Sequence, residues 1–62
     1  MAQFLLIDPN GQVLNIVEAA TIRDAIEWFF FNRDYVITSI TATEATVVSD
    51  EKKFSIRSGS FH

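Results

Sequence analysis

The sequence has no cysteine, two glycines, one proline and one histidine among its 62 residues. Without cysteine the chain has no disulfide, no thiolate nucleophile and no cysteine-ligated zinc, and nothing indicates an oxidising compartment. The N-terminal residues lack the basic start of a signal peptide, and the apolar run 4–7 is too short to span a membrane. We therefore predict a cytoplasmic protein that makes no membrane contact.

Positive charge is also scarce, with five Lys and Arg against eight Asp and Glu and a formal net charge of −3. Binding to a phosphate backbone depends on clustered basic side chains. The basic residues here are scattered along the chain: Arg23, Arg33, Lys52, Lys53 and Arg57. We expect no direct contact with nucleic acid, and either a basic protein surface or no charged partner at all.

Few side chains are suited to catalysis or metal binding. The only histidine, His62, is the last residue of a Ser/Gly segment, where a solvated side chain is the expectation. Asp24 and Glu27 have a spacing that is typical of a solvated helix face rather than of a catalytic pair. The acids of the run 50–53 are followed by two lysines, and the helix entry at 18–21 has no glycine to cradle a phosphate. We predict a non-enzymatic protein without metal or cofactor.

Large apolar side chains, in contrast, are abundant. Six Phe, one Trp and one Tyr contribute to a hydrophobic fraction of 48%. A chain of this length has room for one core only, and buries only about 60% of the surface that it exposes when unfolded. The prediction is a single domain over 1–62, with a flexible tail at 58–62.

The residue patterns predict an α+β fold, with one helix packed on a mostly antiparallel sheet in the order β-β-α-β-β-β. Strands are expected over 3–7 and 12–18, joined by Asp8-Pro9-Asn10-Gly11, whose residue types suit a tight turn. Thr21 is expected to cap a helix over 22–33, with Asp24 in its first turn.

The second half of the chain predicts more strands. The β-branched segment 35–41 is expected to pair with the first hairpin. A second hairpin is expected around the charged run 49–53. Because no glycine or proline separates Ile40 from Thr46, one long, bent strand over 41–49 is an alternative.

Four consecutive aromatic residues, from Trp28 to Phe31, lie in the predicted helix. A stripe at helical spacing faces the sheet, and Phe30 extends its edge; the stripe consists of Ile22, Ala25, Ile26 and Phe29. From the helical angle of about 100° per residue, Trp28 lies about 110° from this stripe and Phe31 lies nearly opposite to it. Some of the aromatic rings must therefore point outward.

An outward Trp28 and Phe31 pair, edged by Asp24 and Glu27, has the composition of an interaction hot spot. These residues are the predicted partner-binding site. The alternative is that both aromatic residues belong to the core, because Trp28 folds over the sheet edge or the C-terminal hairpin covers Phe31.

The first strand is apolar on both of its faces. The side of the sheet away from the helix is therefore expected to be closed by the last hairpin or by another subunit. A homo-oligomeric structural module, whose aromatic residues form the subunit interface, is thus a second hypothesis beside a foreign protein partner.

The segment 20–27, followed by the strand-like segment 35–40, resembles the small inhibitors of host RNA polymerase found in T7-type phages. The resemblance covers about residues 4–41. It implies a phage-type inhibitor or modulator of a host protein such as RNA polymerase, acting in the host cytoplasm, with Asp24 and Glu27 as the matching acidic helix residues. The arginines that the family carries on the following strand are absent, since Ser39 and Thr41 occupy those positions.

Overall fold

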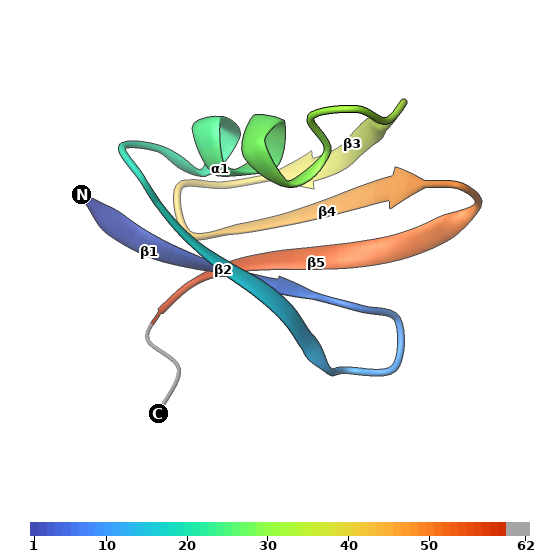
Figure 1. The fold of residues 1–62 in the computed structure, drawn as a ribbon, viewed down its shortest axis with the longest axis horizontal. Coiled ribbons are helices and arrows are strands. Elements are labelled where there is room, and N and C mark those ends of the chain that lie inside the picture. Colours follow the sequence, from blue (N-terminus) through green and yellow to red (C-terminus); the bar gives the residue numbers. More distant parts are fainter. Residues whose placement is uncertain (60–62) are drawn as a thin grey trace.

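In a computed structural model, which describes residues 1–59, the chain forms one helix and one five-stranded sheet (Figure 1). The elements are, in chain order, β1 (Ala2–Ile7), β2 (Val13–Ala19), α1 (Ile22–Phe29), β3 (Val36–Ile40), β4 (Glu44–Ser49) and β5 (Lys52–Ser58). All paired strands are antiparallel, and the order across the sheet is β2-β1-β5-β4-β3. The predicted α+β fold and its β-β-α-β-β-β order are confirmed.

The turn between β1 and β2 is held by the side chain of Asp8. One carboxylate oxygen, Oδ1, accepts hydrogen bonds from the backbone N–H groups of Asn10 (2.9 Å) and Gln12 (2.8 Å). Gly11 has a φ of +89°, which glycine adopts without steric cost, and its N–H donates to the Asp8 carbonyl at 3.0 Å. The tight turn predicted from these residue types is confirmed.

The start of α1 is as predicted. The hydroxyl oxygen of Thr21 accepts a hydrogen bond from the backbone N–H of Asp24 at 3.2 Å, which satisfies one of the free donors of the first turn. The Asp24 carboxylate lies in that turn, where the helix dipole favours negative charge.

The end of α1 differs from the prediction, because the helix stops at Phe29 and does not continue to Arg33. Phe30 has φ −113° and ψ 32°, outside the helical region, although its N–H still donates to Ile26. This turn brings the ring of Phe30 into the core, 5.5 Å from the ring of Tyr35 and 5.6 Å from that of Phe54 between centroids. The helix therefore ends where Phe30 turns into the core and contacts Tyr35 and Phe54, which lie later in the chain.

The strand order corrects the predicted pairing of β3. This strand pairs with β4 at one edge of the sheet, and β5 pairs with β1, so the last hairpin separates β3 from the first hairpin. Between β3 and β4, the Thr41 hydroxyl oxygen accepts from the Glu44 N–H at 3.0 Å, and the Thr41 N–H donates to the Glu44 carbonyl at 2.7 Å. These bonds form a turn without glycine or proline, which excludes the alternative of one long strand.

The core lies between α1 and one face of the sheet. Its buried apolar side chains come from the helix, from the residue directly after it and from four strands: Phe4, Leu6, Ala19, Ile22, Ala25, Ile26, Phe30, Ala45, Val47, Phe54 and Ile56. The helix stripe predicted from the sequence faces this core, with Phe30 buried and Phe29 half-buried.

Among residues 1–59, no segment covers the opposite face of the sheet. The expectation that the last hairpin closes this face is wrong, because β4 and β5 are themselves strands of the sheet. Leu5 and Ile7 are half-buried on this face, and Ile16 on β2 retains 40% of its accessible surface. The open face is therefore partly apolar.

The flexible tail predicted over 58–62 is wrong for Ser58 and Gly59, whose backbone N–H groups are both hydrogen-bonded. Ser58 is the last residue of β5, and its N–H donates to the Thr43 carbonyl at 2.8 Å. The N–H of Gly59 donates to the Gln3 carbonyl at 3.0 Å. The rest of the expected tail, 60–62, with the expected solvated His62, lies outside the described residues.

The turn between β4 and β5 offers a test of backbone strain. Asp50 and Glu51 have φ values of +52° and +63°, in the left-handed region that favours glycine. We expect Glu51→Gly to stabilise the domain by about 1 kcal/mol, because a side chain in this region costs about that amount. Thermal unfolding followed by circular dichroism should show a melting temperature about 4–8 °C higher.

The control for this turn is Glu51→Ala, which removes the carboxylate but keeps the Cβ atom. It should bring no comparable gain. Equal stabilisation by both variants would show that the charge of Glu51, and not its backbone conformation, limits stability.

Candidate functional site

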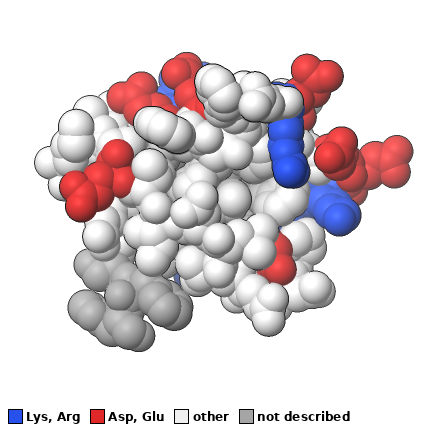
Figure 2. All heavy atoms as spheres, viewed as in Figure 1, with Lys and Arg blue, Asp and Glu red and all other residues white. Residues whose placement is uncertain are grey.

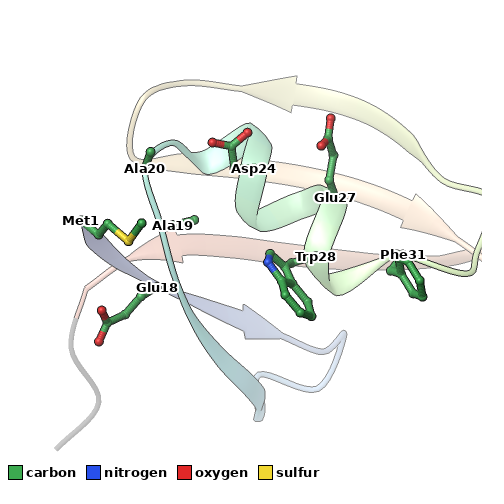
Figure 3. Close-up of a pocket in the computed structure, with 8 residues that line it drawn as sticks. All are labelled: Met1, Glu18, Ala19, Ala20, Asp24, Glu27, Trp28 and Phe31. Carbon is green, nitrogen blue, oxygen red and sulfur yellow. The ribbon is translucent and has the colours of Figure 1, made fainter.

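The four residues predicted to bind a partner line one hollow on the outer side of α1 (Figure 3). The hollow has a volume of about 660 Å³ and is open to solvent. Its other lining residues come from the start of the chain and from the end of β2: Met1, Glu18, Ala19 and Ala20. We call this surface the aromatic–acidic hollow.

Trp28 and Phe31 are exposed. Trp28 retains 69% of its accessible surface and Phe31 retains 77%. The alternative that these residues belong to the core is wrong, because Trp28 on α1 and Phe31, two residues after its end, are both exposed, and the last hairpin is part of the sheet. In the view of Figure 3 the rings of Trp28 and Phe31 project below α1 and the carboxylates of Asp24 and Glu27 project above it, along the opposite margin of the hollow.

The charge of the hollow has one sign. Glu18 on β2 joins Asp24 and Glu27 on α1, all three exposed, and no Lys or Arg is among the lining residues. Within residues 1–59 the ion pair joins Arg57 to Glu44 (N–O 3.3 Å), neither of which lines the hollow. In the view of Figure 2, uncharged side chains fill the centre of the surface and charged side chains lie around its margin.

The sequence did not single out Met1 and Glu18 as residues of the hollow. Ala2 pairs with Ala19 in the sheet, which places the N-terminus beside the end of β2. Only Ala20 and Thr21 separate β2 from α1, so Glu18 stays close to the helix. The pairing that brings Met1 to the hollow is a long-range feature, which the sequence does not indicate. The short connection between β2 and α1 is local, and it could have indicated that Glu18 lies near the helix.

A second hollow, of about 610 Å³, lies at the other end of the sheet face that carries the helix. It is lined by Leu6, Asp8, Pro9, Asn10, Leu14, Phe29, Phe30, Arg33, Lys52 and Phe54. Its bases, Arg33 and Lys52, contrast with the acids of the first hollow. The Asp8 carboxylate is already bonded to the backbone of its own turn.

The described part of the chain contains no group of three or more His, Asp or Glu side chains placed to hold a metal ion. Its single helix, α1, is too short to cross a membrane. The surface of residues 1–59 presents a patch of exposed aromatic rings with carboxylates at its margin. Such a patch is suited to contact another molecule and to orient it.

Comparison of the chain with protein-family models, with curated proteins and with solved structures finds no match.

Proposed function

We propose that this chain is a non-enzymatic protein-binding module that contacts its partner through the aromatic–acidic hollow. The supporting observation is that Trp28 and Phe31 are 69% and 77% exposed in a domain of 62 residues. Small domains depend on apolar burial for their stability, so two large rings left in water are unusual. A protein partner that covers them recovers this burial.

The residue types support the same proposal. Tryptophan is enriched at interaction hot spots, and an aromatic side chain offers about 150–250 Å² of contact area with little conformational entropy to lose. The Asp24 and Glu27 carboxylates beside the rings supply orientation, because charges at the rim of an interface steer encounter and fix register.

The specific partner that we propose is a bacterial RNA polymerase, so that the chain acts as a phage-type inhibitor or modulator. The support is the resemblance of the segments 20–27 and 35–40 to the phage inhibitor family. The two acidic residues that match that family, Asp24 and Glu27, are both exposed and both line the hollow.

The test is the double substitution Trp28→Ala with Phe31→Ala, assayed by interferometry against purified bacterial RNA polymerase. The domain is immobilised through its C-terminus, because Met1 lines the hollow. We expect the affinity to fall at least about tenfold, since tryptophan is a hot-spot residue type and phenylalanine is enriched at interface cores. The circular dichroism spectrum should be unchanged, because substitution of an exposed side chain usually changes the free energy of unfolding by no more than about 0.5 kcal/mol.

The matched control is Val36→Ala, which truncates an apolar side chain that is 64% exposed on edge strand β3, outside the hollow. This variant should bind as the original chain does. Equal binding by the double variant and the control would contradict the proposed surface. Absence of polymerase binding by the original chain would reject this partner.

A homo-oligomeric structural module is the second candidate, and the open sheet face favours it. The half-buried Leu5 and Ile7 and the exposed Ile16 lie on a face that no described segment covers. Sedimentation at micromolar concentration separates the candidates. A strict monomer leaves the aromatic residues free for a foreign partner, whereas a dimer that shields Trp28 from a fluorescence quencher supports self-association.

A further inference from the structure

We infer that the partner segment seated in the aromatic–acidic hollow is basic and apolar, with an arginine side chain that stacks on Trp28 and further basic side chains that meet the carboxylates at the margin of the hollow. This inference rests on the proposed protein-binding function and specifies the chemistry of the occupant. It follows from the charge, the aromatic surface and the origin of the lining residues.

Acidic side chains are concentrated around this hollow. The chain has eight acidic side chains, and three of them line this one hollow without a basic residue among its other lining residues. Arg23, four residues before Glu27 on the helix, is not among the lining residues, and within residues 1–59 the one ion pair joins Arg57 to Glu44, outside the hollow. The carboxylates of the hollow therefore lack a basic counterpart on its walls, and a partner can supply one.

The acids come from two elements. Glu18 is on β2, whereas Asp24 and Glu27 are on α1. The apolar wall between these elements includes Ala19 and Ala20. A segment that lies along the hollow thus meets carboxylates from both elements and apolar surface between them, which matches a peptide carrying basic and apolar side chains.

The exposed ring of Trp28 favours arginine over lysine as the basic residue of the partner. The planar guanidinium stacks on an aromatic face and retains donors for a carboxylate, whereas a lysine ammonium acts as a point charge. Trp28 is the aromatic residue with the strongest attraction for a cation, and it is 69% exposed. Anionic partners such as nucleic acid or a phospholipid surface are disfavoured by the same carboxylates.

The first test uses Trp28 as its own reporter, because it is the only tryptophan of the chain. Two synthetic peptides are compared, one built from arginine, leucine and alanine, the other with glutamate at every arginine position. We expect the arginine peptide to shift Trp28 emission saturably and to bind at least about tenfold more tightly, with an affinity that falls as salt is added.

The matched variants change net charge equally in two places. Glu18→Gln, Asp24→Asn and Glu27→Gln together neutralise the hollow, and they should abolish the preference for the arginine peptide. The control triple variant is Asp34→Asn, Asp50→Asn and Glu51→Gln, all outside the hollow, and it should keep the preference. Melting temperatures of both variants confirm that each is folded.

A second readout needs no peptide. Caesium, a cationic quencher, should quench Trp28 fluorescence more strongly than iodide in the original chain, because carboxylates attract cations to the ring. The neutralised hollow should lose this difference, and the control triple variant should retain it.

Equal binding of both peptides, or an arginine preference that survives in the neutralised hollow, would overturn the inference. Polymerase binding that is lost in the aromatic double variant but kept in the neutralised hollow would leave the proposed function standing and reject the basic segment. In the pure chain, Trp28 emission could also shift with protein concentration. If Arg33→Glu, which reverses a charge of the second hollow, abolished that shift, the occupant would be a second copy of the chain, and the inference of a basic partner segment would be overturned.

Discussion

Phe30→Ala should remove a large part of the free energy of unfolding of the domain. Phe30 is 3% exposed, and its ring packs between those of Tyr35 and Phe54. Truncating a buried phenylalanine costs about 3–5 kcal/mol. At about 0.05–0.15 kcal/mol per residue, a chain of this length has a total stability of only about 3–9 kcal/mol. Urea unfolding followed by circular dichroism measures the loss directly.

The control is the next residue in the chain. Phe31 is 77% exposed, so Phe31→Ala should change the free energy of unfolding by no more than about 0.5 kcal/mol. The same chemical change at adjacent positions then has opposite consequences. Comparable destabilisation by both variants would contradict the end of α1 at Phe29, because a helix continued to Arg33 places the two rings differently.

Ile56→Asp should prevent folding altogether. Ile56 is fully buried at the centre of β5, where it pairs with Leu6 on one side and Ala45 on the other. A carboxylate there has no basic side chain among these neighbours, and an unpaired buried charge costs more than about 4 kcal/mol. The amide NMR spectrum should lose its dispersion.

The control for the sheet is Arg57→Ala, one residue further along β5 and on the opposite face. The ion pair of Arg57 with Glu44 has side chains that are 60% and 62% exposed, and exposed pairs contribute less than about 1 kcal/mol. This variant should fold normally. A folded Ile56→Asp together with an unfolded Arg57→Ala would show that the two faces of β5 are assigned the wrong way round.

The candidate site was predictable to the extent that it depends on the helix alone. Four consecutive aromatics cannot all face one sheet, and helical spacing singled out Trp28 and Phe31 as the outward pair. The structure places both in solvent and gathers them with Asp24 and Glu27 along one hollow. That these residues bind a partner stays a prediction.

The contribution of the rest of the chain to the hollow was not predictable from helical spacing. Met1 reaches it through the pairing of Ala2 with Ala19, and Glu18 reaches it because β2 leads into α1 after two residues. A strand register depends on which strands become neighbours, and alternation of apolar residues leaves several pairings open.

Local residue chemistry was enough, by itself, to determine the first turn, the start of the helix and the order of the elements. Asp8 and Gly11 form the turn with bonds inside their own segment, and Thr21 caps the helix three residues before its partner N–H. Such bonds need no distant partner, so the residue types alone indicate them.

Tertiary structure decided the strand order, the end of α1 and the exposure of the sheet's far face. Phe30 leaves the helix to pack with Tyr35 and Phe54, and β5 inserts between β1 and β4, so the last hairpin extends the sheet and does not cover it. Each of these outcomes depends on contacts between residues far apart in the sequence, which compete for one small core. The absence of cysteine excluded disulfides from the outset, so this arrangement depends on non-covalent contacts.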